Sequence, residues 1–82
     1  MFYYYYPVNL TLEENGTFIA EIENIPEVRT IGKNKNNAFF WIKDALILCL
    51  NERKKYDIKI PKPLPPKDGQ KCVEIGLKFM II

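Results

Sequence analysis

The sequence predicts an α+β domain in which an antiparallel three-stranded sheet is followed by one helix packed on it and by a further strand near the C-terminus. Apolar side chains recur at every second residue before Gly32 and about every 3.6 residues after it, which are the periods of strands and of a helix. The 82 residues, of which 48% are hydrophobic, suffice for one small domain with a modest core. The predicted element order is therefore β-β-β-α-β.

The first two strands form a predicted hairpin. One face of the first strand carries the apolar residues Phe2, Tyr4, Tyr6, Val8, Leu10 and Leu12. Residues 14–16 supply the turn, because Asn15 and Gly16 can adopt a positive φ at little cost. The returning strand continues the same apolar face with Phe18, Ala20 and Ile22.

The third and last strands are shorter and are separated by proline-rich and helical sequence. Pro26 interrupts the alternation, so residues 23–27 are predicted to be a connection and residues 28–31 a short third strand that ends at Gly32. Residues 60–66 hold four prolines, which excludes a helix or a central strand and predicts an extended crossover. A turn at Asp68-Gly69 then leads to a last strand over residues 72–77.

The helix is predicted over residues 35–54, with Asn34 or Asn36 as its N-cap. At 100° per residue, the face that packs on the sheet contains Ala38, Ile42, Ala45, Leu46 and Cys49. Phe40 and Ile47 fall on the opposite face. Two large apolar side chains on the solvent side of a helix indicate a surface for a partner.

The net charge of +2 is divided unevenly along the chain. Residues 1–32 carry five Glu and one Arg, a net charge of −4, whereas residues 33–82 carry a net charge of +6. Such an asymmetry predicts one surface that attracts a basic partner and another that tolerates an acidic one.

The residue types that most enzymes and metal sites need are scarce in this sequence. It contains no His, and its two cysteines, Cys49 and Cys72, form no CxxC pair. We therefore expect free thiols and no zinc site. The longest strongly apolar stretch, residues 45–50, is too short to cross a bilayer, and no secretory signal is recognisable. We therefore expect a cytoplasmic protein that works by binding, without a catalytic residue, a cofactor or a membrane.

Five short motifs occur in an order that resembles a known family. They are Tyr6-Pro7, the acidic turn at residues 13–16, Asn-Ile-Pro-Glu at residues 24–27, Ala45-Leu46 within the helix, and Ile-Pro-Lys-Pro at residues 60–63. Together they resemble the N-terminal domain of the HicB antitoxins of bacterial HicAB modules. Two positions depart from that family, because Asn24 stands where an acidic residue is usual and Lys33 follows Gly32 where Asp or Glu is common.

The resemblance implies a degenerate RNase H-like fold and an antitoxin of a type II toxin–antitoxin module. The implied partner is a HicA-like toxin, a small protein with a double-stranded-RNA-binding-domain-like fold that cleaves mRNA with a His. Such a toxin needs a basic surface for RNA, which an acidic antitoxin surface could mask. We therefore expect the toxin-binding residues to be Glu13, Glu14, Glu21, Glu23, Glu27, Phe40 and Ile47.

The resemblance also bears on domains and assembly. Family members usually continue into a C-terminal DNA-binding domain, and we expect residues 1–82 to be the N-terminal domain without it, so that DNA contact would require the absent domain. Exposed aromatic residues at Tyr3 and Tyr5, together with apolar residues 79–82, predict a homo-oligomer.

Two alternative functions stay open at this point. A nucleic-acid-binding domain could use the basic residues Arg53, Lys54, Lys55, Lys59, Lys62 and Lys67 with the aromatic residues Tyr3, Tyr5 and Trp41. A metal-dependent RNase H-like enzyme would need clustered carboxylates, for which the candidates are Glu21, Glu23, Asp44 and Glu74.

Overall fold

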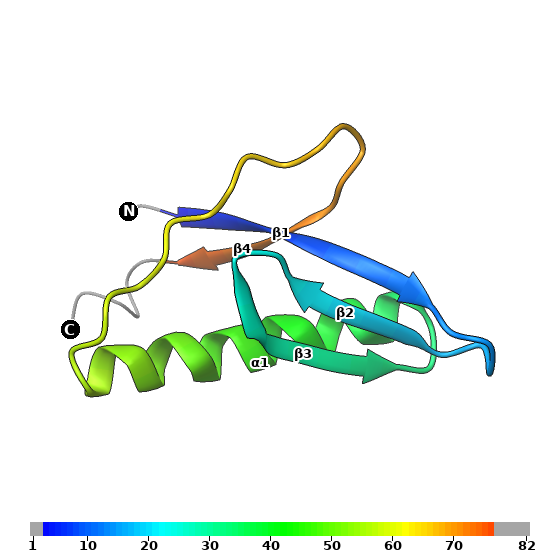
Figure 1. Ribbon diagram of the computed structural model, residues 1–82, viewed down its shortest axis with the longest axis horizontal. Helices are drawn as coiled ribbons and strands as arrows, with labels where there is room; N and C mark the ends of the chain where they lie inside the picture. The colour runs from blue at the N-terminus through cyan, green and yellow to red at the C-terminus, as the bar shows by residue number, and fades with distance from the viewer. Residues whose placement is uncertain (1–2, 77–82) are drawn as a thin grey trace.

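The computed structural model describes residues 3–76, which form a four-stranded antiparallel sheet with one helix lying across one face (Figure 1). The elements in chain order are β1 (Tyr3–Leu12), β2 (Phe18–Ile22), β3 (Ile25–Gly32), α1 (Lys35–Lys55) and β4 (Cys72–Gly76). The spatial order of the strands is β3-β2-β1-β4. The predicted α+β class and element order are confirmed, and the C-terminal strand joins the same sheet as the other three.

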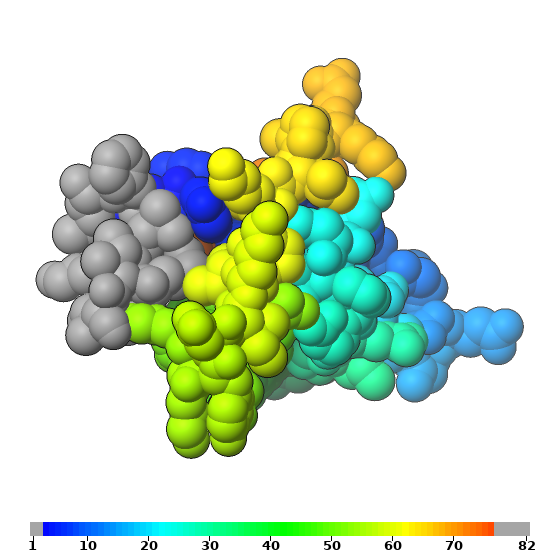
Figure 2. Space-filling model, turned by 60° about the vertical axis from the view of Figure 1, so that its left-hand side comes forward, coloured from blue at the N-terminus to red at the C-terminus, as the bar shows by residue number. Residues whose placement is uncertain are grey.

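The long strand β1 holds the sheet together because each half of it has a different neighbour. Residues 8–12 pair with β2 in a hairpin, with Leu10 opposite Ala20, whereas residues 3–7 pair with β4, with Tyr6 opposite Val73. The turn lies at residues 14–16 as predicted, with Gly16 at φ +88°. The hairpin between β1 and β2 projects from one end of the molecule (Figure 2).

Strand β3 is longer than predicted. The sequence predicted a connection at residues 23–27, but β3 begins at Ile25, directly after a turn at Glu23 and Asn24. The correction has a physical cause: β3 is an edge strand, so Pro26 can sit in it with its missing N–H directed away from β2. A register shift between Glu21 and Ile22 accommodates the tight return.

The N-terminus of α1 is fixed by side-chain caps and by a close contact with β3. The Asn34 side chain accepts a hydrogen bond from the N–H of Asn37 at 2.8 Å, and the Asn37 side chain accepts one from the N–H of Lys33 at 3.0 Å. A Cβ at Gly32 would lie 2.2 Å from the backbone nitrogen of Ala38, so a side chain there would collide with the helix. Both features set where the helix begins and how closely it approaches the sheet.

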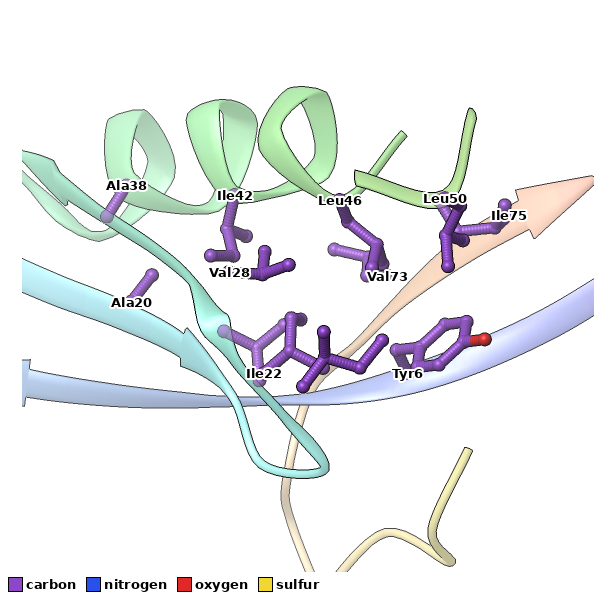
Figure 3. Packing of buried hydrophobic residues seen from close by; sticks show 12 residues of the cluster. Tyr6, Ala20, Ile22, Val28, Ala38, Ile42, Leu46, Leu50, Val73 and Ile75 are labelled. Carbon is purple, nitrogen blue, oxygen red and sulfur yellow. The ribbon is translucent and has the colours of Figure 1, made fainter. Parts of the chain in front are cut away.

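The hydrophobic core lies between α1 and the sheet (Figure 3). The helix contributes Ala38, Ile42, Leu46 and Leu50, which are spaced by four residues, and these pack on Tyr6, Val8, Ala20, Ile22, Ile25, Val28, Val73 and Ile75. A row with a spacing of four turns about 40° around the helix at each step, which follows the twist of the sheet below it.

Because the buried row turns around the helix, several predicted side-chain positions were wrong. Leu50 is buried although the prediction omitted it, whereas Ala45 and Cys49 are half-buried. Ile47 was predicted on the solvent face, but it is half-buried and packs against the core, because the buried row has turned toward it by Leu50. In β1, Leu12 is exposed where burial was predicted; Phe2 and Leu77 lie outside the described residues.

The segment between α1 and β4 crosses from the helix to the sheet edge. Residues 58–66 have no helix or strand structure, and they include the crossover predicted at residues 60–66. Two hydrogen bonds attach it: Tyr6 Oη donates to the Pro61 carbonyl at 2.6 Å, and Asn24 Nδ2 donates to the Lys62 carbonyl at 2.5 Å. Burial raises the pKa of Tyr6 to about 12, so its hydroxyl keeps the donated proton at physiological pH.

Candidate functional site

The solvent side of α1 carries the largest exposed aromatic and aliphatic side chains of the helix. Phe40 is 66% exposed, Trp41 46% and Leu48 63%. At 100° per residue these three positions and Asp44 between them fall within about 100° of the helix circumference. The rings of Phe40 and Trp41 contact each other edge to face, with centroids 5.2 Å apart and planes at 82°. We call Phe40, Trp41, Asp44 and Leu48 the outer helix patch.

An apolar group of this kind suits a protein partner better than a small ligand. Large exposed aromatic side chains are the type of residue that contributes most to binding energy at protein interfaces. Of the two residues predicted on the solvent face, Phe40 is exposed and Ile47 is half-buried, and Trp41 and Leu48, which the prediction did not name, are exposed beside Phe40. The signal was present in the sequence, since Trp41 and Leu48 are seven residues apart and therefore only about 20° apart on a helix.

The acidic residues of the N-terminal half are spread over four places. Glu13 and Glu14 are exposed at the projecting β1–β2 hairpin (Figure 2). Glu21 is half-buried on the sheet face away from the helix, where it lies opposite Asn9 of β1 and Arg29 of β3. The net charge of this half therefore does not gather into a single continuous acidic surface.

The other two acidic residues are tied to basic side chains from the C-terminal half. Glu23 forms an ion pair with Lys67 at 3.4 Å, which joins the β2–β3 turn to the crossover segment. Glu27 forms an ion pair with Arg53, which also donates to the Lys59 carbonyl at 3.1 Å. A backbone hydrogen bond and the Arg53 guanidinium lower the pKa of the Glu27 carboxyl, so Glu27 stays ionised and engaged with Arg53. These two residues therefore have structural roles.

The basic stretch of the alternative nucleic-acid-binding function is also partly engaged. Arg53 and Lys67 are in the ion pairs just described, and the Lys55 ammonium lies over the ring of Tyr56, 5.5 Å from its centroid. Arg53, Lys54 and Lys55 occupy the last turn of α1, where cations stabilise the helix dipole. Trp41 belongs to the outer helix patch, about 21 Å along α1 from Lys55.

The carboxylates of the alternative enzyme do not converge. Val73 and Ile75 face the core, so Glu74 between them faces away from the helix, as Glu21 does on β2. Asp44 lies on the outer side of α1, with the helix and the core between it and those two residues. Among residues 3–76, no group of three or more Cys, Asp and Glu side chains could hold a metal ion.

Two further observations concern the cysteines and the length of the helix. Neither cysteine forms a disulfide: Cys49 and Cys72 are both free and half-buried. Within the described part of the chain, the structure contains no helix long and apolar enough to span a bilayer.

Two comparisons with known proteins give the family of this chain and one relative. Residues 5–81 match the family described as HicB-like antitoxin of bacterial toxin–antitoxin system. A curated relative from Thermoplasma acidophilum, UPF0150 protein Ta0767, is 33% identical over 57 residues, which cover 70% of this chain and 83% of that protein.

Proposed function

Because this chain belongs to the HicB-like antitoxin family of bacterial toxin–antitoxin systems, we propose that it binds and masks a HicA-like, mRNA-cleaving toxin. The outer helix patch carries this proposal, because it gathers Phe40, Trp41 and Leu48 on one exposed surface beside the charged Asp44. In this proposal the protein is a cytoplasmic binding protein, and we assign it no catalytic activity of its own.

The mechanism that we propose divides the work between apolar anchors and charge. Trp41 and Leu48 lose water against the toxin and hold the complex together, since a few central apolar residues supply most of the binding energy at an interface. Glu13 and Glu14 at the hairpin, and Glu21 on the sheet face away from the helix, attract the basic RNA-binding surface of the toxin at long range and speed association. Glu23 and Glu27 contribute less in this proposal, because Lys67 and Arg53 already neutralise them.

Growth rescue and affinity measurements with the cognate toxin test this proposal. That toxin is the small basic protein with one His that we expect in the neighbouring reading frame. The combined variant Trp41→Ala with Leu48→Ala should weaken binding by roughly 30-fold or more, the loss expected when anchor residues are truncated. The faster dissociation should abolish rescue of a strain that expresses the toxin.

A matched control keeps the result specific. Leu64 lies in the crossover segment and is 42% exposed, so Leu64→Ala removes exposed apolar surface elsewhere on the molecule. It should leave affinity and rescue unchanged. Changing Glu13, Glu14 and Glu21 to Gln should slow association, most clearly at low ionic strength. If the Trp41→Ala, Leu48→Ala variant binds and rescues like the unaltered chain, the toxin does not bind at the outer helix patch.

Two parts of the proposal concern larger assemblies. DNA contact is assigned to a C-terminal domain of the kind found in HicB antitoxins, and not to the fold formed by residues 3–76. We also propose that the protein is a homo-oligomer. Tyr3 and Tyr5 are exposed on β1, so they are accessible to an apolar contact with a second copy.

A further inference from the structure

Over its second half, one edge of β1 has no strand beside it within residues 3–76. In an antiparallel sheet, the N–H and C=O groups of alternate residues point to opposite sides of the strand. Glu13 N–H donates to the Thr17 carbonyl at 2.8 Å, so the backbone N–H and C=O groups of odd-numbered residues in this half point toward β2. The N–H of the even-numbered Val8 points to the other side, where it donates to the Lys71 carbonyl at 3.0 Å. The backbone groups of Leu10 and Leu12 therefore point away from β2, beyond the start of β4 at Cys72.

Val8 is the last residue of β1 that is paired on this edge, and the Gln70 side chain binds the strand there. Its Nε2 donates to the Val8 carbonyl at 3.3 Å and to Asn9 Oδ1 at 2.8 Å. Among the described strands, none lies beside Leu10 and Leu12 on this side. An uncovered strand edge is a template on which a further strand can add.

A groove of about 560 Å³ adjoins the open edge. Leu10, Phe39 and Phe40 form its apolar part, and Lys35 and Lys71 also line it, with the Lys35 ammonium over the Phe18 ring, 5.9 Å from its centroid. Lys35 is the first residue of α1, whose first turn contains no acidic residue, so the positive end of the helix dipole adds to the same field. The groove is therefore suited to an extended strand that presents an apolar side chain followed by an acidic one.

The chain itself contains such a strand, at the edge in question. Leu12 is 63% exposed and is followed by Glu13 and Glu14. We propose that two copies of this protein associate by antiparallel pairing of their β1 edges about a twofold axis at Thr11. This inference rests on the homo-oligomer proposed above, whose interface it specifies, and does not depend on toxin neutralisation.

The free backbone groups select one register. Leu10 and Leu12 carry the unpaired groups in both copies, so all of them are used when Leu10 of one copy faces Leu12 of the other. Leu12 of each copy then enters the groove beside Leu10 and Phe39 of the other. Lys71 already occupies the position beside Val8, so the second copy pairs only up to Leu12, and its Glu14 follows in the turn at the end of the open edge, next to Lys71. The contact is isologous and therefore closes as a dimer.

Light scattering after size-exclusion chromatography of the purified 82-residue chain gives the first test. The unaltered chain should be a dimer, and Leu12→Asp should raise the dimer dissociation constant by roughly 30-fold or more, because a charge then enters the apolar groove. Leu48→Asp is the matched control, since Leu48 is also 63% exposed but lies on α1, and it should remain a dimer. Circular dichroism checks that both variants fold.

Charge exchange tests the partners more closely. Glu14→Lys and Lys71→Glu should each weaken self-association, because each places like charges at both symmetric contacts. A mixture of the two variants should recover dimers, because in the mixed pair one contact joins the introduced lysine to the introduced glutamate and the other is the original pair. Recovery in the mixture is not expected from a general change in net charge.

A cysteine at the proposed axis tests the register. Facing residues that are not hydrogen-bonded lie about 4.5 Å apart at Cα, within the range that a disulfide needs. In a background with Cys49→Ser and Cys72→Ser, Thr11→Cys should therefore form a reducible disulfide dimer under mild oxidation. Ile31→Cys, an exposed position on β3, should not. A chain that stays monomeric at high concentration overturns the proposal, as does a dimer that Leu12→Asp and Thr11→Cys leave unaffected.

Discussion

Gly32 shows how a single residue sets the distance between the helix and the sheet. It ends β3, and the backbone of Ala38 in the first turns of α1 approaches it so closely that any Cβ would overlap the helix backbone. The contact is with backbone atoms, which cannot move aside as the end of a flexible side chain can. Gly32 is therefore needed for close packing here and not for an unusual φ.

Replacing Gly32 by Ala should destabilise the protein strongly. The added methyl group forces α1 away from β3, which loosens the core around Ala38 and Ile42, and such overpacking typically costs about 1–3 kcal/mol or more. Chemical denaturation should show a lower free energy of unfolding. Gly76→Ala is the matched control, because a Cβ there would meet the Tyr3 ring at an ordinary 3.6 Å. Equal stabilities of the two variants would contradict the role given to Gly32.

Individual residues differ in how well the sequence predicts them. The turn at Asn15-Gly16 and the cap at Asn34 were predictable, because both follow from the local preferences of Asn and Gly. The exposure of Leu12 was not, although it continues the apolar alternation of β1. Whether the end of a strand is covered depends on the position of the helix and of β4, which local sequence does not encode.

At the scale of elements, Glu27 and Arg53 connect the edge strand β3 to the last turn of α1. The Arg53 guanidinium also binds the Lys59 carbonyl, so the same side chain holds the start of the crossover segment. Three separate parts of the chain therefore meet at one ion pair. Because the Glu27 side chain is about half exposed, solvent screens the pair and limits its contribution to stability.

This ion pair predicts a pH dependence. The folded-state pKa of Glu27 lies below its ordinary value of 4.5, so its contribution is fully present above pH 4.5 and is lost as the pH falls through the lowered value. Glu27→Gln should therefore reduce the free energy of unfolding by about 0.5–1 kcal/mol at pH 7, and by less in acid. Glu13→Gln, at the exposed hairpin, serves as the control and should show no such trend. A Glu27→Gln deficit that is the same at pH 7 and pH 3 would mean that charge is not its cause.

The helix and strands were largely predictable from the sequence, and the errors in those predictions have two causes. The helix was placed at residues 35–54 and is Lys35–Lys55, because a long period of 3.6 is a strong signal. Strand β3 was predicted too short because Pro26 excludes a central strand but not an edge strand, and the sequence does not say which strand is at the edge. The half-burial of Ile47 was missed because the helix packs along a row with a spacing of four, not on a fixed face.

At the scale of the whole molecule, two exposed surfaces have different proposed partners. The outer helix patch centres on Trp41 and Leu48, whereas the β1 edge centres on Leu12 and the groove beside it. Phe40 lies between them, since it belongs to the patch and also lines the groove. Glu14 belongs to both proposals, so the toxin and the second copy should compete for the β1–β2 hairpin.

This arrangement predicts that the two activities separate by mutation. Leu12→Asp should give monomers that bind the toxin at least as tightly as the unaltered chain, because the hairpin is then free. Leu48→Asp should give dimers that bind the toxin poorly. Self-association and toxin affinity, measured on both variants, check this. Loss of both activities in one folded variant would show that a single surface serves both partners.

The surfaces proposed to bind partners were harder to predict than the fold. The alignment of Trp41 with Leu48 follows from helix geometry and could have been read from the sequence. The engagement of Glu23 and Glu27 could not, because their partners Lys67 and Arg53 lie 44 and 26 residues away. The open edge of β1 likewise depends on where β4 begins to pair, a long-range property to which no local pattern corresponds.

The division of β1 between two neighbours also has a consequence for synthesis of the protein. Residues 8–12 meet β2 through a short hairpin, so this pairing forms locally and early. Residues 3–7 pair with β4 near the other end of the described chain, so the pairing of Tyr6 with Val73 cannot form until Val73 has been synthesised. The core around Tyr6, Val73 and Ile75 therefore closes only after β4 has left the ribosome, so a chain whose translation stops before Cys72 has an unfinished sheet and is a substrate for proteolysis.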